Sequence, residues 1–156
     1  MNRVFITTGG TLALVLLLNA CGADGNDANG ASDASPVATA AATSNDITGS
    51  VKEWEVNVDA TAAEAGTVDF TIANEGTIGH EFLIVKTDIA PGDIPVEGDH
   101  FPEDASDIEV IDEIGEFTKG TTEALTVTLE PGSYQLVCNL PDHYENGMFV
   151  GFEVLQ

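Results

Sequence analysis

Three side chains that bind soft metals occur at regular intervals near the end of the chain. Cys138, His143 and Met148 are five residues apart each time, and the residue types between them are typical of a loop. Thiolate and thioether groups favour Cu(I), and an imidazole accepts either oxidation state of copper. A loop between neighbouring strand ends can bring all three side chains to one point. The spacing therefore predicts a copper site.

A blue copper site needs a second imidazole, because two histidines and one cysteine form its ligand plane and a methionine lies on the axis. The chain has three histidines. His80 opens an apolar run after a glycine-rich turn, so we expect its ring at the strand end where the 138–148 loop should also lie. His100 lies in an acidic stretch, where we expect an exposed loop residue. His80 is therefore the better candidate.

Short alternating runs of apolar residues indicate the elements that position these groups. From about Thr48 onward, apolar residues recur at every second position, which is the period of a half-buried strand. Turn sequences such as Asn74-Glu75-Gly76 and Pro131-Gly132 separate the runs, and no helical run lies between them. The pattern predicts an antiparallel β-sandwich of about 110 residues. The expected strands are 54–58, 68–72, 80–85, 125–129, 134–138 and 148–155.

Acidic residues dominate the chain and one stretch in particular. The whole chain carries 27 Asp and Glu against 4 Lys and Arg, and such a surface repels the phosphates of nucleic acids. Solubility or a salty medium explains the charge as well as a cationic partner does. Residues 88–116 hold eleven acids and no Lys or Arg. We expect a long acidic loop there, followed by a strand over 109–114; a short helix from Ser106 is the alternative.

The first twenty residues resemble the signal peptide of a bacterial lipoprotein. Arg3 precedes an apolar run over 12–18, which is too short to span a bilayer comfortably. Leu18-Asn19-Ala20-Cys21 then resembles a lipobox, whose cysteine takes a diacylglyceryl group and becomes the mature N-terminus. The resemblance implies export and a lipid anchor at Cys21, on the periplasmic or another extracytoplasmic face of a membrane. An ordinary cleaved signal or an uncleaved apolar anchor is the alternative.

The segment after this motif differs in composition from both neighbours. Residues 22–47 contain no aromatic residue and almost no branched apolar one, so they cannot bury enough surface to offset their ordering entropy. We expect a signal peptide over 1–20, a lipidated cysteine and flexible tether over 21–47, and one folded domain over 48–156. With Cys21 lipidated, Cys138 is a lone thiol in an oxidising compartment, which indicates a role. A Cys21–Cys138 disulfide is the competing interpretation.

From Val51 to Gln156 the sequence is similar to the cupredoxins, in the group of plastocyanin, azurin, auracyanin and sulfocyanin. The similarity rests on Gly79-His80 in a strand context, on Pro131-Gly132-Ser133-Tyr134 before the cysteine, and on the Cys-x4-His-x4-Met loop. It implies an all-β fold, an antiparallel Greek-key β-sandwich with one type 1 (blue) copper ion per chain at one end. The metal ligands that it implies are His80, Cys138, His143 and Met148.

The resemblance also implies a function. It indicates a monomeric electron-transfer protein, not an enzyme, that exchanges one electron with redox-protein donors and acceptors. These would dock near His143, whose ring is expected at the surface among Leu140, Pro141 and Phe149. A copper carrier without an electron-shuttle role is the alternative. A multicopper enzyme would need more histidines than His100, the one histidine left over.

One residue departs from the family pattern. Many cupredoxins have an asparagine after the first histidine ligand, which helps to fix the ligand loop near the thiolate, whereas this chain has Glu81. Alternation along the strand points Glu81 away from His80, so we expect an exposed side chain. The loop would then be held in another way, for instance through Asn139.

Overall fold

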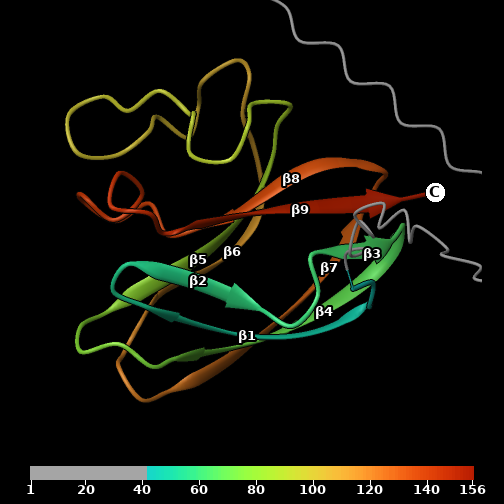
Figure 1. Ribbon diagram of the computed structural model, residues 1–156, viewed down its shortest axis with the longest axis horizontal. Coiled ribbons are helices and arrows are strands. Elements are labelled where there is room, and N and C mark those ends of the chain that lie inside the picture. The colour runs from blue at the N-terminus through green and yellow to red at the C-terminus, as the bar shows by residue number, and fades with distance from the viewer. Residues whose placement is uncertain (1–41) are drawn as a thin grey trace, which may run out of the picture. The chain divides into compact units, whose positions relative to one another are not determined.

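The computed structural model describes residues 42–156. The expected signal peptide, the lipidated Cys21 and most of the expected tether lie outside the described residues. Within 42–156, nine strands form two sheets that pack face to face (Figure 1). No helix in this part of the chain is long and apolar enough to cross a membrane. The strands are β1 Asp46–Lys52, β2 Glu55–Val58, β3 Ala62–Glu64, β4 Gly66–Asn74, β5 His80–Lys86, β6 Glu109–Phe117, β7 Thr122–Leu129, β8 Gly132–Val137 and β9 Phe149–Leu155.

The β-sandwich predicted from the alternating pattern is confirmed, but its sheets are mixed rather than purely antiparallel. The four-stranded sheet has the order β2-β1-β4-β7, and the five-stranded sheet has the order β3-β9-β8-β5-β6. β1 pairs parallel with β4, and β3 pairs parallel with β9, whereas the remaining pairs are antiparallel. Alternation reports which face of a strand is buried and not the direction of its neighbour, so the parallel pairs left no signal in the sequence.

The first strand was missed because a glycine interrupts its apolar pattern. Ile47 and Val51 are buried, and Gly49 lies between them on the same face. A Cβ at Gly49 would collide with the Asn57 carbonyl oxygen, so the neighbouring strand leaves no room for a side chain. Trp54, which the pattern placed inside a strand, instead lies in the turn between β1 and β2.

The acidic stretch forms a loop followed by a strand, as expected, and the alternative helix is absent from it. β6 begins at Glu109 and runs to Phe117, three residues beyond the predicted end. Ile94 and Phe101 anchor the loop, because both are buried in a second hydrophobic cluster with residues of β5 and β8 and with Tyr144. The Tyr144 hydroxyl accepts hydrogen bonds from the N–H groups of Gly92 and Ile94, at 3.1 and 3.2 Å, and joins this loop to the 138–148 loop.

Three connections meet at one end of the sandwich, at the left of Figure 1. They are the turn from β1 to β2, the turn from β4 to β5 and the loop from β8 to β9. Glu53 of the first connection bonds to Thr77 of the second, and the Trp54 ring packs on His143 of the third. β1 runs toward this end and β9 runs away from it, so Asp46 and Leu155 lie at the opposite end.

Candidate metal centre

The side chains of His80, Cys138 and His143 converge at the end where these connections meet. The Nδ1 atoms of the two rings are 3.2 Å apart. The Cys138 Sγ lies 3.2 Å from the Nδ1 of His143 and 4.0 Å from the Nδ1 of His80. All three donor atoms lie within 4.8 Å of one another, which is close enough to share one ion. The spacing argument is therefore correct in bringing together His80 with the cysteine and histidine of the loop.

The strands and the loop fix these donors on the backbone. His80 is the first residue of β5, Cys138 follows the last residue of β8, and Met148 precedes the first residue of β9. The Cys138 N–H donates to the Met148 carbonyl at 3.0 Å, and the Met148 N–H donates to the His143 carbonyl at 3.2 Å. His80, Cys138 and Met148 are each 0% exposed. The methionine thus lies at the same end, with its backbone bonded to both loop residues of the cluster.

Burial leaves the three groups neutral and ready to bind a cation. Burial raises the pKa of the Cys138 thiol to about 11. Burial lowers the pKa of His80, an effect that His143 reinforces, and burial lowers the pKa of His143 as well. Each imidazole therefore keeps a lone pair at neutral pH, and the thiol gives up its proton when a metal binds. Two imidazoles, one thiol and one thioether suit copper better than zinc, because zinc seldom takes a thioether.

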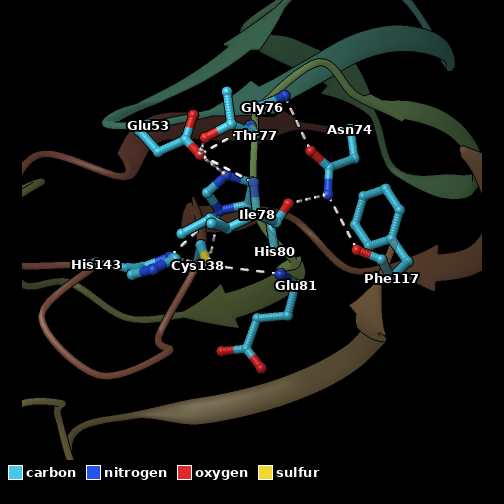
Figure 2. Close-up of polar contacts among 10 residues, drawn as sticks. All are labelled: Glu53, Asn74, Gly76, Thr77, Ile78, His80, Glu81, Phe117, Cys138 and His143. Carbon is cyan, nitrogen blue, oxygen red and sulfur yellow. Dashed lines mark hydrogen bonds and ion pairs between the residues drawn. The ribbon is translucent and has the colours of Figure 1, made fainter. Parts of the chain in front are cut away.

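Glu81 is half-buried, and the expectation of an exposed side chain is wrong. Its backbone N–H points at the Cys138 Sγ, at 3.4 Å, while its side chain points away from His80 (Figure 2). The Glu81 carboxylate accepts a hydrogen bond of 2.8 Å from the Asn139 N–H. Burial raises the pKa of this carboxyl, and the carboxylates around it add to the effect. Glu81 therefore holds the strand that carries His80 against the residue next to Cys138.

Asn139 holds the ligand loop from its other side, as expected for this residue. Its amide oxygen accepts from the Phe101 N–H at 3.0 Å, and its amide nitrogen donates to the Phe101 carbonyl at 3.0 Å. A third bond of 3.0 Å joins the same nitrogen to the Glu103 carboxylate. The acidic loop is thus part of the frame around the site.

The ring of His143 lies beneath Trp54, so the prediction of a surface-exposed ring is wrong. His143 is only 6% exposed. The indole ring of Trp54 packs edge-on against it, with centroids 5.2 Å apart and planes at 84°, and is itself 46% exposed. Of the three residues expected around His143, Leu140 is half-buried and Pro141 is exposed. Phe149 instead packs on Tyr144, with centroids 5.3 Å apart, in the second hydrophobic cluster.

The third histidine lies outside the cluster. His100 is exposed in the acidic loop, and its Nδ1 is 2.7 Å from the Asp99 carboxylate. This placement matches the expectation of a loop residue.

Three residues around His80 were not singled out from the sequence: Glu53, Asn74 and Gly76. Asn74 is 1% exposed, and its side chain bonds to the Gly76 N–H and to the carbonyls of Ile78 and Phe117, at 3.0 Å each (Figure 2). The sequence marked Asn74 and Gly76 only as a turn. Nothing local to Glu53 indicates its contact with a turn 24 residues further along the chain.

Solved structures of an auracyanin, a rusticyanin and an azurin have a similar fold. No protein-family model matches the sequence, and no curated protein matches it. Auracyanin from the photosynthetic bacterium Roseiflexus castenholzii is 24% identical with a TM-score of 0.55, over 74% of this chain and 100% of that chain. Rusticyanin from Thiobacillus ferrooxidans is 21% identical with a TM-score of 0.52, over 72% and 77%. An azurin from Methylomonas sp. strain J is 14% identical with a TM-score of 0.51, over 71% and 98%.

These neighbours and the converging donors lead to one conclusion. The chain has the cupredoxin fold, and at the end of its sandwich His80, Cys138 and His143 bring together donor atoms that could hold one metal ion, close to the buried Met148.

Proposed function

We propose that this protein transfers single electrons at a type 1 copper site, and that its metal ligands are His80, Cys138, His143 and Met148. The convergence of two Nδ1 atoms and one Sγ atom within 4.8 Å, beside a buried methionine, carries the proposal. Bound copper supplies a one-electron couple between Cu(I) and Cu(II). The similar rusticyanin is described as a copper protein and was solved in its reduced form, and the similar auracyanin was solved after reduction with dithionite.

The chain holds the donor side chains in a frame of paired strands and backbone hydrogen bonds. His80 is held in β5, whose backbone is paired on both sides by β6 and β8. A backbone hydrogen bond joins Cys138 to Met148, and the Glu81 carboxylate accepts a hydrogen bond from the N–H of Asn139, the residue after Cys138. A close-packed frame resists movement of the donors, and electron transfer is fast when the donors need not move.

Spectra of the copper-loaded protein test the ligand assignment. The wild type should bind one copper per chain and show an intense visible band from the thiolate-to-copper transition, together with the corresponding EPR signal. Cys138→Ala should abolish that band, and His80→Ala should abolish or displace it. His100→Ala is the matched control, because it removes the histidine outside the cluster and should leave the spectrum unchanged. A visible band that survives Cys138→Ala would show that the assignment is wrong.

Reversible redox cycling separates an electron carrier from the alternative, a copper carrier or delivery protein. Cyclic voltammetry should give one reversible wave with no loss of copper over repeated cycles. A copper carrier would release its ion on reduction or pass it to a chelator on a timescale of minutes. We do not expect enzymatic turnover, since a second copper centre would need further histidines, and His100 is the one that remains.

The redox partner docks over the ring of His143. The exposed face of Trp54 and the neighbouring Leu140 and Pro141 offer an apolar surface there. Apolar contact resists salt, whereas steering by the acidic surface is screened by it. Leu140→Lys should therefore slow electron transfer to the partner at both low and high salt, while the protein remains a monomer. Wild-type transfer by Leu140→Lys at high salt would place the exit of the electron on another face.

The lipid anchor at Cys21 belongs to the same proposal. An exported domain held at a membrane surface would meet membrane-bound redox proteins, and acyl chains supply the anchoring that one short apolar run cannot. Mass spectrometry of the mature N-terminus decides between a diacylglyceryl cysteine and an unmodified terminus. A mature chain that retains residues 1–20 would exclude the anchor.

A further inference from the structure

We infer that the Glu53 carboxylate is the outer partner of His80, holding the ring with Nδ1 toward Cys138 and fixing a negative charge at its Nε2 edge, which lowers the reduction potential. This inference rests on the proposed function. It concerns a residue that contacts neither Cys138 nor His143 through any hydrogen bond. Figure 2 shows the Glu53 carboxylate facing the edge of the imidazole that points away from the thiol.

The Nε2 atom of His80 has no hydrogen-bond partner, although it is fully buried. Among the residues that the structure describes, it is the one buried side-chain nitrogen or oxygen without a partner. The Nδ1 atom of the same ring faces the thiol and the other imidazole, so it is the nitrogen available to a metal. A ring that binds through Nδ1 carries its hydrogen on Nε2, and such a hydrogen is usually directed at a carboxylate, a carbonyl or a water.

Glu53 supplies the negative group that this edge lacks. Its Oε1 lies 3.8 Å from the His80 Nε2, which is an electrostatic contact rather than a hydrogen bond. The same oxygen accepts from the Thr77 N–H at 2.8 Å, from the Thr77 hydroxyl at 2.9 Å and from the Ile78 N–H at 3.1 Å. These three hydrogen bonds hold the carboxylate in place, and a glutamate side chain is ordinarily ionised at neutral pH.

The turn before β5 is shaped to bring the two groups together. A Cβ at Gly76 would lie 2.6 Å from the His80 Nε2 and 3.0 Å from the second oxygen of Glu53. Only a glycine leaves the imidazole edge and the carboxylate in contact with the same stretch of backbone. Asn74 fixes that stretch, because its side chain accepts from the Gly76 N–H and donates to the Ile78 carbonyl. The position of the partly exposed Glu53 side chain against His80 is thus determined by its hydrogen bonds to this turn.

The electrostatic consequence has a definite sign. A fixed negative charge stabilises the more positive Cu(II) form of the site relative to Cu(I). Removing the charge favours Cu(I), so the reduction potential rises. A cation bound at Nδ1 also makes the Nε2–H a stronger donor, which increases its attraction to the carboxylate.

Glu53→Gln tests the inference in the full copper-loaded protein. The variant keeps an oxygen that can accept from Thr77 and Ile78 and loses only the charge. At a fixed ambient potential, the ratio of oxidised to reduced protein should fall about tenfold, which is a rise of about 59 mV for a one-electron couple. Glu75→Gln is the matched control, because it removes one charge from an exposed side chain of the same turn. It should change that ratio far less.

A second measurement needs no copper. Nitrogen-15 NMR of the metal-free wild type should show His80 as the Nε2–H tautomer, with a slowly exchanging ring hydrogen that exchanges faster in Glu53→Gln. An Nδ1–H tautomer, or equal potentials for Glu53→Gln and Glu75→Gln, would overturn the inference. Failure of the proposed function has a different signature: a wild type without the visible band would refute the copper site, while the tautomer of His80 would still decide the role of Glu53.

Discussion

The side chain of Asn74 should contribute far more to the free energy of unfolding than the side chain of another asparagine that makes the same number of hydrogen bonds. Its side chain makes three bonds of 3.0 Å with backbone groups, and the residue is buried. A hydrogen bond contributes about 1 kcal/mol net, and a buried group left without a partner costs about 1–3 kcal/mol. Asn74→Ala leaves three backbone groups without partners, so we expect the free energy of unfolding to fall by about 3 kcal/mol.

Asn45 provides the matched control within the same chain. Its side chain also makes three bonds with backbone groups, two to Glu64 and one to Thr67, at 2.9–3.0 Å. These bonds are exposed, so water can replace the lost amide, and Asn45→Ala should cost about 1 kcal/mol or less. The comparison isolates the effect of burial from the number of bonds.

Urea denaturation of the metal-free protein is the appropriate assay, because bound metal would add its own stabilisation. With a slope of about 1.5 kcal/mol per molar urea, the midpoint should fall by about 2 M for Asn74→Ala and by well under 1 M for Asn45→Ala. The two slopes should match the wild type, so that the midpoints report stability alone. Equal midpoints for the two variants would refute the argument from burial.

Other changes have expected outcomes of a definite sign. Burial raises the pKa of Glu81, so this carboxyl favours the fold below about pH 4.5 and loses that contribution as pH rises. Glu81→Gln should therefore be the more stable protein at pH 7 and equal to the wild type at pH 3, by urea denaturation; a less stable variant at pH 7 would contradict this. Hydrogen bonds from Thr48 lower the pKa of Asp59, so its contribution is present above about pH 3.8 and lost as pH falls. Asp59→Asn should lose stability at pH 7 and match the wild type in acid. Met148→Leu should keep copper and show a higher potential by voltammetry, since a weak donor that stabilises Cu(II) is gone; complete loss of copper would make Met148 a principal ligand.

The chemistry of the site could be predicted from the sequence because its signals are local. Cys138, His143 and Met148 lie within eleven residues, and a strand on each side fixes the loop that carries them. His80 could be assigned because few histidines compete with it. The sandwich followed from alternation, since one face of each strand packs against the other sheet.

The surroundings of the site could not be predicted, because they depend on contacts between distant segments. The Glu53 carboxylate meets residues 24 and 25 positions later, and the Glu81 carboxylate meets Asn139 across 58 positions. Trp54 lies two positions before the buried Val56, so the alternating pattern predicted that its ring would also face the core. The strand begins only at Glu55, however, and the indole ring packs on His143 instead. Sequence spacing assigns a residue to a face and does not say what the fold brings against it.

The directions of β1 and β9 determine at which end of the domain a linker can be attached. The first strand begins at Asp46 and the last strand ends at Leu155, and both residues lie at the end of the sandwich away from the cluster of His80, Cys138 and His143. Either position could be joined to a surface linker, a fused domain or an electrode support. Such an attachment would contact the end of the domain that is away from Trp54 and would leave the surface around Trp54 free. An attachment at either position would therefore lie at the end of the domain opposite the cluster of His80, Cys138 and His143 and would not cover it.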